Sequence, residues 1–166
     1  MEKIFTALSF DDVLLVPKFS SIKTRKTISL QSCMGISTFD IPVISSPMDT
    51  VSEDQMINEM ARLGGFGILH RYNTIDEQLK IASSFTNPSK SAVAIGVTGD
   101  FAERASALYE LGIRIFCLDV AHGHHENVKN ALSKLRSFFS KDVHLMAGNV
   151  ATLEAFNDLS DWEQIA

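Results

Sequence analysis

The chain has 166 residues, of which 45% are hydrophobic and 21% are charged, and its net charge is -5. This length fits about one domain, and the composition is that of an ordinary soluble globular protein. The negative charge gives no electrostatic case for nucleic-acid binding, and no run approaches the roughly 20 apolar residues that a membrane helix needs. The N-terminus has no secretory pattern, and Cys33 and Cys117 cannot form a disulfide framework, so we expect a cytoplasmic protein with reduced thiols.

Residues 1–40 differ in pattern from the rest of the chain. Residues 8–17 form a short apolar-rich segment that ends in a turn at Pro17, and residues 28–32 are compatible with a strand. We expect an irregular N-terminal lead-in that packs across one end of the structure formed by residues 41–166.

From residue 41 onward, strand-like apolar runs alternate with helix-like runs. The strands are expected at residues 41–46, 65–70, 92–97, 113–120 and 143–148. Because the runs are almost continuously apolar and alternate with helices, they predict a parallel sheet buried on both faces. Ligands bind such sheets at the carboxyl ends of the strands, so the polar residues that follow each run should line one rim.

The expected helices carry start and stop signals. Pairs with capping-box spacing, or a close variant of it, are Ser52 with Gln55, Thr74 with Glu77, and Asp100 with Glu103. Gly64 and Gly112 occupy positions typical of the residue that ends a helix.

Two α/β architectures fit this rhythm, a doubly wound open sheet and a (β/α) barrel. The two commonest phosphate-binding glycine loops of open sheets are missing from the sequence. The short βα units suit a barrel, but a typical barrel has eight strands in about 250 residues, and this chain supplies five.

Residues 119–125 form the densest polar cluster, with one acid and three imidazoles after a buried strand. A metal site is a weak interpretation of His122 and His124, because barrel metal sites collect ligands from several strand ends. Only His70 is a further histidine candidate at this rim, and His144 lies near the start of its strand, toward the opposite rim.

Asp119 is the most informative member of this cluster, whereas His125 is expected to open the next helix and face water. A carboxylate at the end of a buried strand needs partners, because burying it unpaired is costly. Cofactor hydroxyls or loop amides could supply them, or the carboxylate could simply tie down its own loop.

Two further loops hold candidate ligand contacts. Residues 45–50 combine two hydroxyls, a proline and an acid after the first strand, and Asn149 follows the fifth strand with an amide that can both donate and accept. No nucleophile motif is present, and Cys117 lies in an apolar strand as a small hydrophobe whose burial raises its thiol pKa.

Five ordered segments resemble the IMP dehydrogenase / GMP reductase family. They are Leu8-Ser9-Phe10-Asp11-Asp12-Val13-Leu14-Leu15, Ser45-Ser46-Pro47-Met48-Asp49-Thr50-Val51-Ser52-Glu53, Gly64-Gly65-Phe66-Gly67-Ile68-Leu69-His70-Arg71, Leu118-Asp119-Val120-Ala121-His122-Gly123-His124 and Ala147-Gly148-Asn149-Val150-Ala151-Thr152. The resemblance covers nearly the whole chain and is lost only over residues 159–166.

The resemblance implies a partial (β/α)8 TIM barrel, made of the first five βα units of a fold that is usually tetrameric. Family members oxidise IMP with NAD or reduce GMP with NADPH, and both reactions pass through a bond from a cysteine to the purine C2. By resemblance, the purine mononucleotide contacts Ser46, Met48 and Asn149. The dinucleotide cofactor would face Asp119 and the Ala121-His122-Gly123 loop, with His70 and Arg71 nearby.

Several family features would lie beyond residue 166. These are the catalytic cysteine loop, the phosphate-binding loops and part of the monovalent-cation site of the dehydrogenase branch. Neither Cys33 nor Cys117 matches the family cysteine, so we expect the isolated chain to be inactive.

The resemblance favours GMP reductase over IMP dehydrogenase. Dehydrogenases usually carry a regulatory insertion between the second helix and the third strand, whereas residues 85–91 bridge this gap directly here, and residues 117–121 also favour the reductase. An IMP dehydrogenase that lacks the insertion is the first alternative. The others are a metal-dependent hydrolase using His122 and His124, and a non-catalytic module whose unpaired edge strands dock a complementing half-barrel or another copy.

Overall fold

The computed structural model describes residues 8–34 and 37–165, and it contains a small antiparallel hairpin and a parallel sheet. The hairpin consists of β1 (Ser32–Met34) and β2 (Ser37–Phe39). The parallel strands are β3 (Ile44–Ser45), β4 (Phe66–Leu69), β5 (Ala92–Ile95), β6 (Ile115–Leu118) and β7 (His144–Ala147). The α-helices are α1 (Asp54–Arg62), α2 (Ile75–Ala82), α3 (Phe101–Glu110), α4 (Glu126–Phe139) and α5 (Leu153–Ile165). Short 3-10 turns span Phe10–Asp12, Arg25–Thr27 and Pro88–Lys90.

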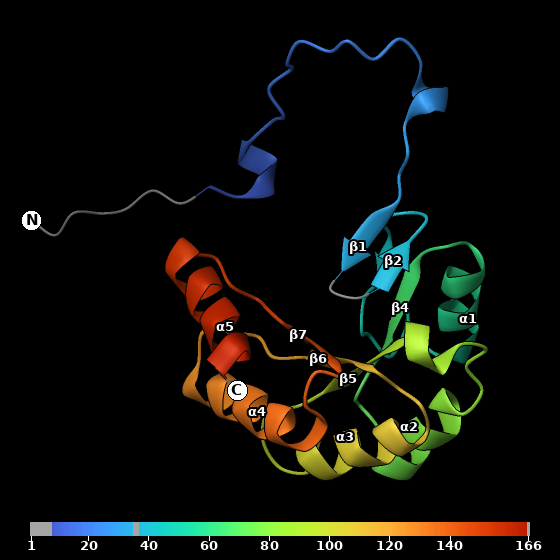
Figure 1. The fold of residues 1–166 in the computed structure, drawn as a ribbon, viewed down its shortest axis with the longest axis vertical. Helices are drawn as coiled ribbons and strands as arrows, with labels where there is room; N and C mark the ends of the chain where they lie inside the picture. The colour runs from blue at the N-terminus through green and yellow to red at the C-terminus, as the bar shows by residue number, and fades with distance from the viewer. Residues whose placement is uncertain (1–7, 35–36, 166) are drawn as a thin grey trace, which may run out of the picture.

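The five parallel strands lie side by side in chain order, from β3 at one edge to β7 at the other. Figure 1 shows the helices wrapped around one side of this sheet. One apolar cluster, which includes Leu69, Val93 and Phe116 of the strands, packs the sheet against the helices. The cluster on the opposite face contains only strand and hairpin residues, among them Phe66, Ile68 and Ala94. A sheet with helices on one face only is a partial (β/α) barrel, as predicted, and not a doubly wound sheet.

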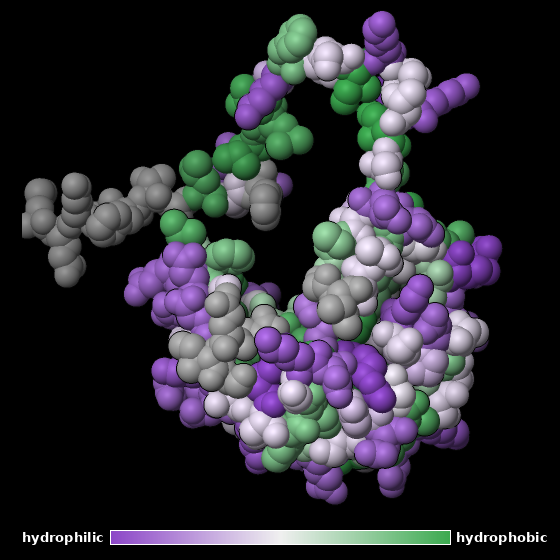
Figure 2. Space-filling view, viewed as in Figure 1, coloured by the Kyte–Doolittle hydropathy of each residue, from purple (hydrophilic) through white to green (hydrophobic). Residues whose placement is uncertain are grey.

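The hairpin β1–β2 packs on the face of the sheet opposite the helices, which we call the inner face. There the Phe39 and Phe66 rings lie 4.9 Å apart. The strand expected at residues 28–32 is wrong, since β1 begins only at Ser32. Residues 8–31 form an arm whose apolar side chains are mostly exposed, as the green side chains in Figure 2 show. Packing of the whole lead-in 1–40 on the barrel stays a prediction, and its residues 1–7 and 35–36 lie outside the described part of the chain.

The helix signals are partly confirmed. Thr74 and Glu77 form the expected capping box at α2, and Gly64 and Gly112 end their helices with φ angles of 81° and 102°. The box expected at Ser52 is wrong, because α1 begins after Glu53 and the Ser52 hydroxyl bonds to the preceding loop. Asp100 does precede α3, but its carboxylate accepts from Arg104 and not from a helix amide.

None of the helices in the described part of the chain has the length and apolar character needed to cross a membrane.

Candidate functional site

The polar loops that follow β3, β4, β6 and β7 all lie at the carboxyl end of the parallel sheet, because parallel strands end at the same rim. This brings every sequence-predicted site residue to one end of the molecule. The contacts between the loops decide which of these residues can act together.

Arg71 and Asp119 link the loops that follow β4 and β6. Arg71 follows β4, and its Nε lies 3.2 Å from both the Oδ2 and the backbone oxygen of Asp119, which follows β6. The backbone N–H of Asp119 donates to the carbonyl of Ile95 at the end of β5. The carboxylate therefore has a cationic partner from a distant loop, whereas the sequence analysis expected only cofactor groups or its own loop.

Asn149 joins the loops after β6 and β7. Its backbone has a φ of 60°, and its Nδ2 donates to the Val120 carbonyl at 2.7 Å. The Gly123 amide donates back to the Asn149 carbonyl at 3.0 Å. A Cβ on Gly123 would lie 2.0 Å from the Gly148 oxygen, so only glycine permits this approach of the two loops.

The loop after β3 is held by a buried serine. The Ser52 Oγ donates to the Ser46 carbonyl and lies 2.9 Å from the Ser45 Oγ. Ser52 is fully buried, whereas the Met48 side chain is half exposed at the rim. The loop thus has an internal anchor and presents Ser46 and Met48 outward.

His70 is turned away from solvent. Its side chain is 3% exposed, its Nδ1 accepts from the Tyr72 amide, and its Nε2 lies 3.3 Å from the Glu53 carboxylate. Because Nδ1 accepts, Nε2 carries the ring proton toward Glu53. His70 lines a cleft of about 770 Å³ beside α1 and α2, so its expected contact with a cofactor stays a prediction.

The three histidines after β6 diverge. His122 is exposed at the rim, and His125 accepts from the Asn127 amide as the cap of α4, as expected. His124 pairs with Asp158 at 2.8 Å and stacks on Trp162 of α5. Within residues 8–34 and 37–165, no three His, Cys, Asp or Glu side chains are grouped to hold a metal ion.

The two thiols occupy different environments. Cys33 is exposed on the hairpin, and Cys117 packs among the apolar residues of the inner sheet face. Burial raises the pKa of the Cys117 thiol to about 11, and the nearby charge of Asp119 adds to this rise. A thiol with so high a pKa is a poor nucleophile near neutral pH.

Sequence reasoning missed two buried polar residues beneath the rim, Gln78 and Arg104. A signal was present, since each occupies the second position of an apolar i, i+3, i+4, i+7 stripe on its helix. The stripes are Ile75, Gln78, Leu79 and Ala82 on α2, and Phe101, Arg104, Ala105 and Leu108 on α3. A polar side chain in such a stripe is placed toward the core, where it needs a partner.

Comparison with known proteins gives one consistent family. The family model described as IMP dehydrogenase / GMP reductase domain matches residues 7–165. A GMP reductase of Mycoplasma mycoides subsp. mycoides SC is 31% identical over 163 residues, covering 96% of this chain and 49% of that protein. An inosine-5'-monophosphate dehydrogenase of Cryptosporidium parvum is 32% identical over 203 residues, covering 95% of this chain and 50% of that protein.

A solved structure gives the same result. The crystal structure of inosine 5' monophosphate dehydrogenase from Legionella pneumophila matches with a TM-score of 0.85 and 38% identity, covering 95% of this chain and 48% of that one. The chain thus spans about half the length of the relatives that it matches. The dehydrogenase alignment over 203 residues is longer than this chain, so that relative has residues without a counterpart here.

Proposed function

Because the chain belongs to the IMP dehydrogenase / GMP reductase family, we propose that its rim forms part of the site of an oxidoreductase acting on a purine mononucleotide. The observation that carries this proposal is the joining of the rim loops by Arg71–Asp119 and by Asn149–Gly123. These contacts bring together residues from the family-like segments after β4, β6 and β7. The segment after β3, which carries Ser46 and Met48, lies at the same rim.

The mononucleotide, GMP or IMP, is assigned to Ser46, Met48 and Asn149. The half-exposed Met48 offers an apolar surface to a purine ring, and the Asn149 amide, from the loop after β7, offers a hydrogen-bonding group. The Ser52 hydroxyl fixes the Ser46 carbonyl, and the Val120 carbonyl fixes the Asn149 side chain, before a ligand arrives. Such preorganisation lowers the entropy cost of binding.

The dinucleotide cofactor, NADPH or alternatively NAD, is assigned to Asp119, the 121–123 loop and Arg71, with His70 behind them. The Arg71 Nε donates to Asp119, and the guanidinium remains partly exposed at the rim. There it can bind an anionic or hydroxyl-rich ligand. Gly123 acts by allowing close backbone approach, because its Cβ position is taken by the Gly148 oxygen. When bound, the reduced cofactor would supply a hydride to the purine ring.

The GMP reductase reaction, NADPH-dependent conversion of GMP to IMP with release of ammonia, is favoured over oxidation of IMP to XMP. In the structure, α2 leads to β5 through a short turn at Pro88–Lys90, and Phe85 is buried against the core. No inserted module occupies this connection, and regulatory insertions at this point are characteristic of the dehydrogenase branch.

The 166-residue chain is proposed not to complete this reaction alone. Of its two thiols, Cys33 lies on the exposed hairpin and Cys117 lies buried with a raised pKa, so neither suits the covalent step. The test is to incubate the purified chain with GMP and NADPH, or with IMP and NAD, and to follow absorbance at the cofactor's reduced band. Turnover by either pair would contradict the proposed inactivity.

A second candidate function is an interaction module that docks another copy or a complementing half-barrel. Within the described residues, β3 and β7 each have one unpaired edge, and Val43 and Ile44 at the β3 edge are about half exposed. Exposed strand edges pair readily with other chains. Sedimentation equilibrium would test this proposal, and a monomer at high concentration would count against it.

A further inference from the structure

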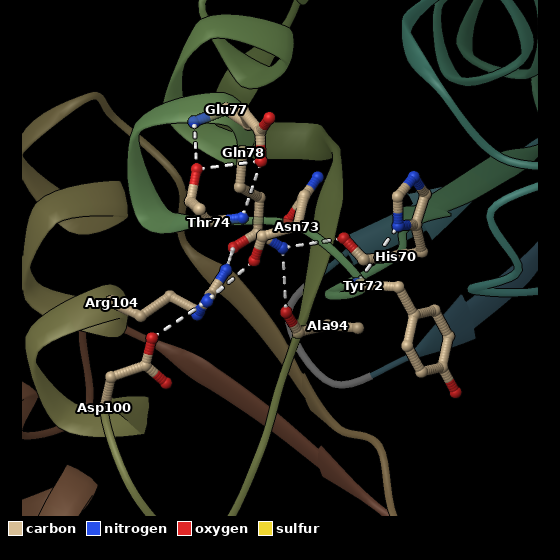
Figure 3. A network of polar contacts seen from close by, with 9 residues as sticks. All are labelled: His70, Tyr72, Asn73, Thr74, Glu77, Gln78, Ala94, Asp100 and Arg104. Atoms are coloured by element: carbon tan, nitrogen blue, oxygen red, sulfur yellow. Dashed lines mark hydrogen bonds and ion pairs between the residues drawn. The ribbon is translucent and has the colours of Figure 1, made fainter.

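We propose that Gln78 and Arg104 are positioning residues that fix the loop between β4 and α2 and thereby aim Arg71 at Asp119. This inference rests on the proposed function only in the role that it gives to Arg71. Figure 3 shows the two side chains at the centre of a polar network that joins α2, α3 and the ends of β4 and β5.

Gln78 bridges the ends of two neighbouring strands. The registered pairing of β4 with β5 ends at Leu69 and Val93. The next carbonyls along these strands, those of His70 and Ala94, both accept from the Gln78 Nε2, at 2.8 and 3.0 Å. The Gln78 amide therefore continues the connection between the strands after their own pairing has ended.

The contacts of Gln78 require this residue type. Its Nε2 donates to two carbonyl oxygens, which can only accept. Its Oε1 accepts from the Arg104 Nη1 at 2.9 Å, and this nitrogen can only donate. Only one orientation of the amide satisfies all three partners. A glutamate would place an oxygen against two carbonyls, and a methionine would leave all three partners unpaired.

Arg104 extends the network to the far end of the loop. Its Nη2 donates to the Asn73 carbonyl at 3.0 Å and to the Asp100 carboxylate at 2.9 Å. Arg104 is 6% exposed, and burying a guanidinium is costly unless its donors are satisfied. Within the described residues, the Asn73 side-chain amide has no partner, so the network holds this residue by its backbone carbonyl.

Fixing both ends of this loop also constrains the two residues between them. The carbonyls of His70 and Asn73 are both fixed, by Gln78 and Arg104 respectively, and Arg71 and Tyr72 lie between them. Arg71 then passes beside Gly96, which directly follows β5 and where an added Cβ would lie 3.7 Å from the Arg71 Nη1, and reaches Asp119. Two buried side chains thus set the path of a rim cation that contacts neither of them.

A purely structural role would make Gln78 and Arg104 no different from other fully or partly buried side chains that donate to backbone carbonyls. Arg114 provides the comparison, since its Nη1 donates to the carbonyls of Tyr109 and Ile113 near the start of β6, away from the rim. Loss of either arginine should lower stability, but only the loss of Arg104 should disturb Arg71.

The test is the ¹⁵N–¹H cross-peak of the Arg71 Nε–H, identified by its disappearance in Arg71→Lys. We expect this peak to be shifted and slow to exchange in the wild type, and to move to the free-arginine position in Gln78→Met and Arg104→Met. In the control Arg114→Met it should stay in place, although the melting temperature falls. An unchanged Arg71 peak in folded Gln78→Met and Arg104→Met would overturn the proposal.

If the methionine variants do not fold, Arg104→Lys decides the question. Lysine keeps the positive charge beside Asp100 but lacks the planar fork that reaches Gln78 and Asn73 together. The Arg71 peak should move part of the way, and an unmoved peak would again overturn the proposal. This measurement contains no nucleotide, so absence of NADPH binding to the wild type would refute the proposed function and leave the positioning result standing.

Discussion

Arg71 and Asp119 are joined across a strand that contributes neither residue. They follow β4 and β6, the strand β5 lies between these two, and the Arg71 Nε stands 3.2 Å from the Asp119 Oδ2. The contact holds two rim loops in a fixed relationship without any ligand. The proposed cofactor site therefore has a preformed polar centre.

The Arg71–Asp119 pair should show measurable coupling. Its side chains are 35% and 23% exposed, so the pair is partly screened and should contribute about 1 kcal/mol. A double-mutant cycle with Arg71→Met and Asp119→Asn, followed by urea denaturation, would measure the coupling. The matched control is the more exposed pair Arg62–Glu59, for which we expect a smaller value. Equal coupling in the two cycles would argue against a preformed rim contact.

The buried thiol of Cys117 predicts a loss of stability at alkaline pH. Its pKa is raised from 9.0 to about 11 in the folded chain, so the folded state resists ionisation. The contribution is complete below the unfolded-state pKa and is lost as the pH rises from 9 to 11, by roughly 3 kcal/mol in total. Chemical denaturation across this range should show the loss in the wild type and in Cys33→Ser.

The same series in Cys117→Ala isolates the effect. This variant should lose that part of the pH dependence, while the remaining pH dependence is common to all three proteins. If Cys117→Ala and the wild type lose stability in parallel between pH 9 and 11, the thiol is not protected as the structure indicates.

Two adjacent glycine positions should respond very differently to alanine. A Cβ at Gly123 would lie 2.0 Å from the Gly148 oxygen, whereas a Cβ at Gly148 would meet nothing within 4 Å. We expect Gly123→Ala to lower the free energy of unfolding by about 1–3 kcal/mol or more, since the two loops must separate. Gly148→Ala should have a small effect, and equal losses in the two variants would contradict the close approach of these loops.

Removal of the Ser52 hydroxyl should loosen the loop that presents Ser46 and Met48. The variant Ser52→Ala leaves the Ser46 carbonyl without its donor, and such a loss costs about 1–3 kcal/mol. Thermal unfolding should show the loss, and GMP binding should weaken. The control Ser133→Ala, at an exposed position of α4, should change neither quantity. Unaltered binding in a destabilised Ser52→Ala would separate this loop from the proposed nucleotide site.

The sheet and its rim were predictable because their signals are local. Continuous apolar runs such as residues 92–97 are closed by glycines and polar residues, and this pattern placed all five parallel strands. The edges were less accurate, as the run 113–120 contains only the four residues Ile115–Leu118 in strand form. Polar residues at the ends of the runs belong to the loops, where hydrogen bonds to neighbouring loops replace those of the sheet.

The partners of the rim residues were not predictable, because they come from elsewhere in the chain. The Asp119 carboxylate needed a partner, but nothing in its own segment pointed to Arg71, which is distant in sequence. Gln78 and Arg104 were overlooked although they interrupt the apolar stripes of their helices. Ser52 has a sequence pattern typical of a helix cap, and its burial in the preceding loop depends on how that loop folds back.

We propose that the carboxyl rim of the sheet binds a purine mononucleotide and a dinucleotide. Titration of the ¹⁵N-labelled chain with GMP and then with NADPH, followed by backbone chemical shifts, measures this binding residue by residue. We expect GMP to shift Ser46, Met48 and Asn149, and NADPH to shift residues 119–123 and Arg71. Shifts confined to the cleft beside α1 and α2, or none at millimolar ligand, would contradict the proposed binding at the rim.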